Sequence, residues 1–119
     1  PAVPGITIHP GGTLAYASYD DSGSGTTTVV RWAVDPATGA LSGETELYSE
    51  TGFGTNLYEA IDVGPEGKYL YVTNWQGQAI KVFTINQTTG EITFQQDYVP
   101  SDPAVYPHTN VAFSKIAAP

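Results

Sequence analysis

The sequence predicts an all-β protein made of β-propeller blades: an incomplete ring of two four-stranded antiparallel blades, followed by the first strand of a third. Three observations favour this fold class. A unit of about fifty residues occurs twice. Each copy contains four short runs that are typical of strands, and clusters of turn-forming residues separate these runs. Because propellers close with roughly four to eight blades, the chain is too short to close a ring by itself.

The repeat is clearest when the unit is divided into two halves. The first half reads ITIHPGGTLAYAS at Ile6–Ser18 and IDVGPEGKYLYVT at Ile61–Thr73. The second half reads VVRWAVDPATGAL at Val29–Leu41 and IKVFTINQTTGEI at Ile80–Ile92. Between its halves, the first copy carries a longer polar loop at Asp20–Thr27.

A third copy begins with NVAFS at Asn110–Ser114. We therefore interpret residues 1–119 as one partial propeller. Its first blade is expected at about residues 5–49, its second at about residues 58–100 and the start of a third at about residues 108–115.

In the second copy, the four expected strands alternate or run apolar with β-branched and aromatic residues. They cover Ala60–Val63, Lys68–Thr73, Ala79–Ile85 and Glu91–Tyr98. The connections at Gly64–Gly67 and Asn86–Gly90 contain the residues that tight turns use, including a glycine at the end of each that tolerates a positive φ. No segment shows a sustained helical period, so the pattern indicates blades without helices.

Composition limits the ligands and partners. Twelve acidic and four basic residues give a net charge of −8, so nucleic acid and anionic membrane surfaces are poor partners. No apolar run approaches ~18 residues, which argues against membrane insertion. Cysteine is absent, so disulfides and thiolate metal sites are excluded. We expect no cofactor and no metal, because the run at Asp20 and Asp21 lacks the ligand spacing of known calcium loops.

The compartment stays open. The first residues lack the basic and apolar regions of a signal peptide, whereas Asn86-Gln87-Thr88 is an N-glycosylation sequon at the tip of a turn. A cytoplasmic protein and a secreted one both fit, since asparagine also suits a turn without a glycan.

Three stretches carry a family resemblance. Tyr71–Asn74 reads YVTN, Val34–Leu41 reads VDPATGAL, and Pro107–Ser114 reads PHTNVAFS. Together they resemble the lactonase-type seven-bladed propellers with YVTN repeats, which include 6-phosphogluconolactonases and carboxymuconate cyclases. The resemblance covers nearly the whole chain up to Ser114, where Lys115 stands in place of the Pro-Asp-Gly that the family continues with. It implies a segment of a propeller that hydrolyses or forms a small lactone or carboxylate; the alternative is a non-catalytic propeller that serves as a binding or surface scaffold.

Strand alternation separates two ends of each blade. The short turns gather at one end, and the longer connections gather at the other end, where loops held by a rigid scaffold commonly carry function. The longer connections contain Tyr58, Glu59, Trp75, Tyr106 and His108.

His108 is the first catalytic candidate, because the resemblance places it at the start of an innermost strand that faces the channel. A neutral imidazole there could act as a general base or orient a carboxylate substrate; the alternative is a surface-loop histidine. Glu59 is the second candidate for acid–base work, against the alternative of an exposed glutamate. Tyr58, Trp75 and Tyr106 are the candidate substrate contacts.

The catalytic arginine of the family has no match in this chain. Arg31 lies inside an expected strand beside Trp32, where we expect it to stack on an aromatic ring or pair with a carboxylate. A pocket for an anionic substrate needs a cation, so we expect the partners to be further propeller blades, from the same protein or from other chains, which would supply one. A small-molecule ligand completes the expected partners. Whether the full-length protein is a lactonase or a lactonising cycloisomerase stays open, and this segment alone is not expected to be an enzyme.

Overall fold

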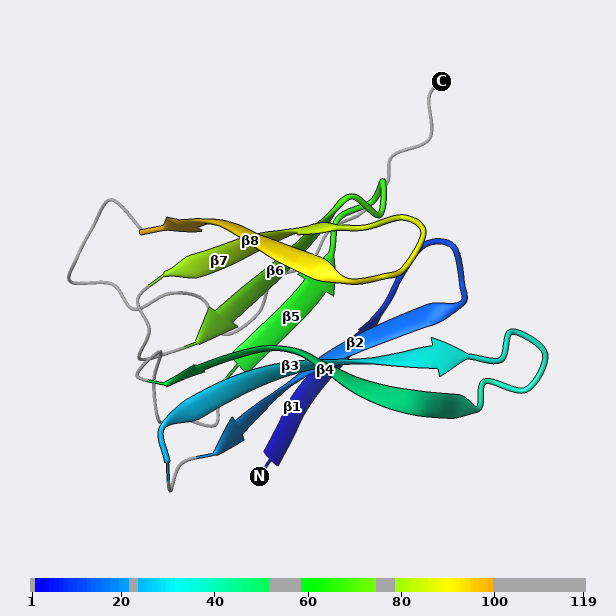
Figure 1. The fold of residues 1–119 in the computed structure, drawn as a ribbon, viewed down its shortest axis with the longest axis horizontal. Helices are drawn as coiled ribbons and strands as arrows, with labels where there is room; N and C mark the ends of the chain where they lie inside the picture. Colours follow the sequence, from blue (N-terminus) through cyan, green and yellow to red (C-terminus); the bar gives the residue numbers. More distant parts are fainter. Residues whose placement is uncertain (1, 22–23, 52–58, 75–78, 100–119) are drawn as a thin grey trace.

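The computed structural model describes residues 2–21, 24–51, 59–74 and 79–99. Within these ranges every element is a strand, and the eight strands form two four-stranded sheets. Each sheet runs in sequence order, and every neighbouring pair is antiparallel. The prediction of an all-β protein made of propeller blades is confirmed, and Figure 1 shows the two blades stacked face to face.

The first blade contains strands β1 to β4. They are β1 (Ala2–Ile8), β2 (Leu14–Asp21), β3 (Thr26–Val34) and β4 (Leu41–Thr51). The second blade contains β5 to β8, which are β5 (Glu59–Val63), β6 (Tyr69–Asn74), β7 (Ile80–Ile85) and β8 (Ile92–Tyr98). The ends of the second-blade strands lie within one residue of those expected from the sequence.

The short turns have the same backbone conformation in both blades. In the hairpin loops between the third and fourth strands, the amide of Gly39 donates to the carbonyl of Asp35 at 2.7 Å, and that of Gly90 donates to Asn86 at 2.8 Å. Gly39 and Gly90 both have a φ of 77°, a left-handed conformation that side chains with a Cβ rarely adopt. The repeat in the sequence is therefore a repeat of local geometry.

The hydrophobic core lies between the two blades. The first blade contributes Tyr16 and Val29, and the second contributes several buried side chains of β5, β6 and β7. These are Ile61, Val63, Leu70, Val72, Phe83 and Ile85. Aromatic rings continue the contact outward: Tyr48 of β4 meets Phe83 edge-on, with ring centroids 4.9 Å apart. The two blades therefore share one apolar core.

Candidate functional site

The long connections are attached to strands at one end of the two blades. We call this end of the blades the loop end. In the second blade, β5 begins at Glu59, which pairs with Asn74 at the end of β6. In the first blade, the start of β1 at Ala2 pairs with Asp20 near the end of β2. The described strand ends on either side of residues 52–58 are Thr51 and Glu59, and both lie at this end. The connections in which the sequence placed its candidate site lie outside the described residues, apart from Glu59.

The innermost strands β1 and β5 lie side by side (Figure 1) and are joined through polar groups. The hydroxyl of Thr7 donates to a carboxylate oxygen of Asp62 at 2.9 Å. The same hydroxyl oxygen accepts from the amide of Val63 at 3.3 Å. Thr7 is buried, so these bonds fix the spacing of the two strands along the inner edge of the blades.

Of the five predicted site residues, the structure places the backbone of one. Glu59 is the first residue of β5, at the loop end and on the innermost strand of its blade. Tyr58, Trp75, Tyr106 and His108 lie outside the described residues, so their roles stay predictions. Tyr58 directly precedes Glu59, and Trp75 directly follows its pairing partner Asn74.

A buried lysine, which sequence reasoning did not single out, lies between the blades near the loop end. The ammonium nitrogen of Lys81, on β7, lies 2.9 Å from Glu50 Oε2 of the first blade and 2.9 Å from Asp97 Oδ1 on β8. It also lies 5.0 Å from the centroid of the Phe94 ring. The sequence carried one signal for this site: Lys81 lies between two apolar residues of the strand, Ile80 and Val82.

The charges around Lys81 explain its protonation state. Burial alone would lower the pKa of this ammonium group. The hydrogen bonds to Asp97 and the ion pair with Glu50 outweigh burial and raise the pKa of Lys81 above its usual value. Lys81 is therefore held as a cation whose charge is already matched by Glu50 and Asp97, and it is not available to an anionic substrate.

Arg31 does not have the partner that the sequence suggested. Instead of an aromatic ring or a carboxylate, its guanidinium group donates a hydrogen bond to the backbone carbonyl of Thr89 in the second blade. This contact lies in the hairpin loop at the short-turn end, because Thr89 directly precedes Gly90. The expectation was wrong because it considered only residues near Arg31 in the sequence, whereas the blade packing supplies the acceptor. The arginine is a contact between blades, far along the strands from the loop end.

His9 is the only histidine in the described part of the chain, and it also lies at the short-turn end. Its Nδ1 accepts from the amide of Gly11 at 2.9 Å, so the proton is on Nε2, which donates to the carbonyl of Gly67 at 3.1 Å. One of these hydrogen bonds is to the backbone of the first blade, at Gly11, and the other is to the backbone of the second blade, at Gly67. This histidine therefore holds one turn against the other.

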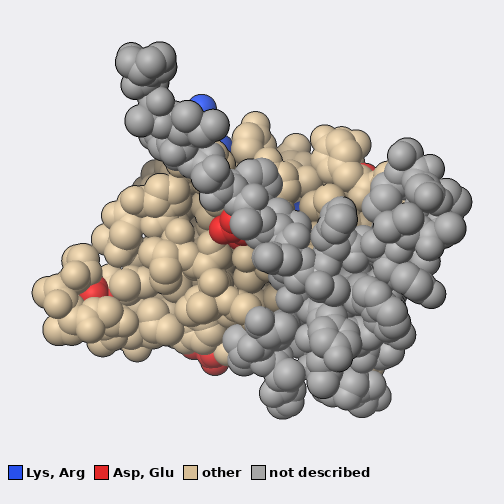
Figure 2. Space-filling view, turned by 180° about the vertical axis from the view of Figure 1, so that it is seen from behind, with Lys and Arg blue, Asp and Glu red and all other residues tan. Residues whose placement is uncertain are grey.

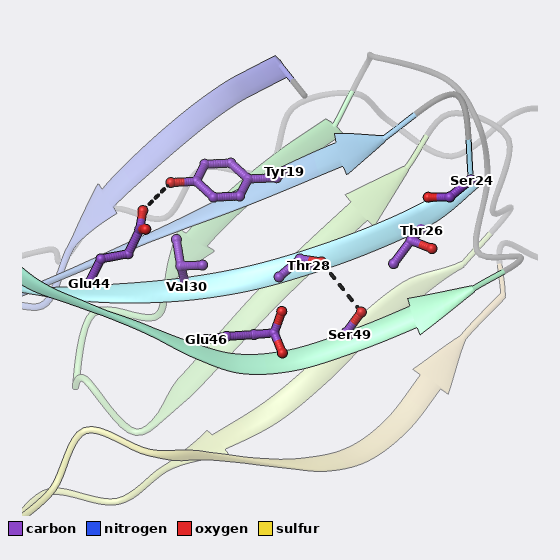
Figure 3. Close-up of a pocket in the computed structure, with 8 residues that line it drawn as sticks. All are labelled: Tyr19, Ser24, Thr26, Thr28, Val30, Glu44, Glu46 and Ser49. Carbon is purple, nitrogen blue, oxygen red and sulfur yellow. Dashed lines mark hydrogen bonds between the residues drawn. The ribbon is translucent and has the colours of Figure 1, made fainter.

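A hollow in the first blade is lined by none of the five predicted site residues. It has a cavity volume of about 450 Å³ and is formed by β2, β3 and β4 on the face of the first blade that points away from the second (Figure 3). Hydroxyl and carboxylate groups line it, and the hydroxyl of Tyr19 donates to Glu44 across it. That hydrogen bond, with smaller contributions from burial and from the charge of Glu44, raises the pKa of Tyr19 to about 12.

Other site classes find no support in the described ranges. No group of three His, Cys, Asp or Glu residues there lies close enough to hold a metal ion. None of these residues forms a helix that is long and apolar enough to cross a membrane. Figure 2 shows scattered acidic groups and little basic colour on the described part of the rear face.

Comparison with known proteins agrees with the architecture. The family model described as lactonase, seven-bladed β-propeller, matches residues 4–107. The chain belongs to this lactonase family. Its two sheets are thus two blades of a lactonase-type propeller, and the strand order observed here is that of propeller blades.

Two solved structures are similar to the lactonase segment. One is a candidate 6-phosphogluconolactonase from Bacteroides uniformis, with 25% identity and a TM-score of 0.62. The other is a candidate 6-phosphogluconolactonase from Bacteroides fragilis, with 26% identity and a TM-score of 0.62. Each match covers 82% of this chain but only 26% of the other one, so the chain spans about a quarter of these structures. No curated protein matches the sequence.

Proposed function

We propose that the chain works as part of a larger lactonase-type propeller that hydrolyses a small lactone. The observation that carries the proposal is the family match over residues 4–107, together with two structural neighbours that are both described as candidate 6-phosphogluconolactonases. A ring-opened sugar acid is the product class that this reaction gives. Lactone hydrolysis is preferred to lactone formation because both neighbours carry the name of a hydrolase.

The loop end is the proposed location of the chemistry. Glu59 begins the innermost strand β5 at this end, and Tyr58 and Trp75 are adjacent in sequence to the paired residues Glu59 and Asn74. In this proposal His108 is the general base that activates water, Glu59 assists proton transfer, and Tyr58, Trp75 and Tyr106 contact the ring of the lactone. The inner strands β1 and β5, held by the Thr7–Asp62 bond, supply the rigid edge.

The cation that such a substrate needs comes from other blades in this proposal. The two cationic side chains that the structure describes between the blades are both engaged: Lys81 with Glu50 and Asp97, and Arg31 with the carbonyl of Thr89. Lys68 is exposed in the short turn that precedes β6, at the opposite end from the proposed site. Among the described residues no cation besides the paired Lys81 is placed near the loop end, and Lys115 lies outside them. In this proposal an arginine or lysine of further blades binds a carboxylate or phosphate on the lactone.

The test is direct. A complete propeller protein that contains this segment is incubated with 6-phosphogluconolactone, and the acid released by hydrolysis is followed at constant pH against the spontaneous rate. The proposal predicts saturable acid release that is proportional to the concentration of the protein. Acid release no faster than in buffer would overturn the enzymatic proposal and favour a non-catalytic propeller scaffold.

A further inference from the structure

The charged residues around Lys81 connect three strands near the loop end. The Nζ atom of Lys81 lies 2.9 Å from Glu50 Oε2 of the first blade. It also donates to both carboxylate oxygens of Asp97 in the second blade, at 2.9 and 3.2 Å. We call Lys81, Glu50 and Asp97 the ion cluster. Its lysine is only 4% exposed, so the cluster joins the two blades at a point that is largely shielded from water.

Each member of the ion cluster lies close to the loop-end terminus of its strand. Glu50 is the last residue but one of β4, and Asp97 is the last but one of β8. Lys81 is the second residue of β7 and pairs directly with Asp97. Three strand ends from two separate sheets are therefore joined through one side chain.

The same three strand ends border the connections that contain the candidate site. In the sequence, β4 is followed by residues 52–58 and then by Glu59. β7 is preceded by the connection that begins with Trp75, and β8 is followed by the segment that contains His108. The five predicted site residues thus lie in or beside connections that start or end at the strands of the ion cluster.

The repeat shows that blade packing does not need a lysine at this position. Lys81 corresponds to Val30 of the first blade, which is itself buried. Apolar residues in place of a whole buried ion cluster are often neutral or stabilising, because no charges then have to lose their hydration. Stability alone therefore explains the ion cluster less well than the arrangement of the strand ends that it fixes.

The ion cluster joins a different part of the blades from the other polar contacts between them. Tyr16, Arg31 and His9 bind backbone carbonyl groups in turns at the short-turn end, and Thr7 joins the innermost strands. The outermost strands β4 and β8 belong to different sheets, so no ladder of backbone hydrogen bonds sets their separation. Lys81 binds one carboxylate on each of them, near the ends from which the long connections leave.

We propose that Lys81 is a positioning residue for lactone hydrolysis: by binding Glu50 and Asp97 at once, it sets the spacing of the strand ends from which the site-bearing connections leave. This inference rests on the proposed function. Lys81 acts through the connections and does not touch the substrate. Such an effect can be large, because a displacement of about 1 Å in a reacting group can lower a rate by about 10²-fold.

The test uses the complete propeller protein with 6-phosphogluconolactone, at a temperature where circular dichroism shows that every variant is folded. Lys81→Met removes the cation and keeps most of the length of the side chain. We expect kcat to fall by about tenfold and KM to rise by about threefold or more. The rise in KM separates positioning from unfolding, because an unfolded fraction lowers the apparent kcat and leaves KM unchanged.

Two further variants serve as controls. Lys81→Arg keeps a cation that can bind both carboxylates, and we expect it to bring kcat and KM back to within about threefold of the unchanged protein. Tyr16→Phe breaks a hydrogen bond between the blades at the short-turn end. Because this bond is remote from the strand ends that the ion cluster joins, we expect Tyr16→Phe to leave both constants unchanged.

The outcomes separate this inference from the proposed function. An unchanged protein that does not hydrolyse the lactone would overturn the proposed function and this inference with it. If the unchanged protein is active, three results would overturn this inference alone: Lys81→Met with unchanged kcat and KM, Lys81→Arg as impaired as Lys81→Met, or equal changes in Lys81→Met and Tyr16→Phe.

Discussion

The hydroxyl of Tyr16 donates a hydrogen bond of 2.8 Å to the carbonyl oxygen of Gly90, joining β2 of the first blade to a hairpin loop of the second. Tyr16 is fully buried. This bond, the Arg31–Thr89 contact and the His9–Gly67 contact all reach from first-blade side chains to second-blade turns. Side chains of the first blade therefore bind backbone carbonyl groups in the turns of the second blade.

Tyr16→Phe removes the donor and leaves a buried carbonyl without it. We expect the free energy of unfolding to fall by about 1–2 kcal/mol, the usual cost of such a loss. Urea denaturation of the two chains at neutral pH measures the difference. Tyr98→Phe, at a tyrosine that is 53% exposed, is the matched control and should change the free energy by less than about 0.5 kcal/mol.

The same tyrosine predicts a loss of stability at alkaline pH. Burial raises the pKa of Tyr16 to about 12, against a smaller lowering by the charge of Arg31. The raised pKa means that the neutral hydroxyl contributes its full stability below pH 10, and this contribution is lost as the pH rises from 10 through 12. Urea denaturation at pH 9 and pH 11.5 should show the advantage of the unchanged chain over Tyr16→Phe shrinking. An advantage that is constant or larger at pH 11.5 would contradict the assignment.

A pair of glycine substitutions separates backbone strain from blade contact. Gly39→Ala and Gly90→Ala both force alanine to a φ of 77°, which costs about 1–2 kcal/mol. Only at Gly90 would the new Cβ also meet another blade, 2.8 Å from Leu14 and 3.1 Å from Arg31. We expect Gly90→Ala to lower the free energy of unfolding by about 1–3 kcal/mol more than Gly39→Ala does. Equal losses, measured by urea denaturation at low chain concentration, would mean that the contact at Gly90 is not formed.

Lys81→Met tests the charge network between the blades. The methionine fills the buried stem but leaves the carboxylates of Glu50 and Asp97 facing each other without a cation. We expect a loss of about 1–3 kcal/mol, less than for a fully buried pair because the two acidic side chains are 34% and 41% exposed. In a Glu50→Gln, Asp97→Asn background the same change should cost much less. An equal cost in both backgrounds would show that packing, and not charge, explains the effect.

The fold could be predicted largely from the sequence because its signals are local. The repeat of Ile6–Ser18 at Ile61–Thr73, the period of the strands and the turn residues each depend on neighbours along the chain. The partners of Arg31 and Lys81 could not be predicted, since Thr89 and Glu50 reach them only when the blades dock. Of the candidate site residues, Glu59 was predicted at the loop end and is found there, at the start of β5. His108 lies outside the described residues, so its position stays a prediction.

The measurement that tests the proposed site most directly compares the two histidines of this chain in the complete propeller protein. His108 is the proposed base at the loop end, whereas His9 bonds to Gly11 and Gly67 at the short-turn end. With 6-phosphogluconolactone as substrate, His108→Ala is predicted to lower kcat by about 10²-fold or more, and His9→Ala to leave kcat unchanged below its unfolding temperature. An unchanged kcat in His108→Ala, or an equal loss in both variants, would contradict a catalytic site at the loop end.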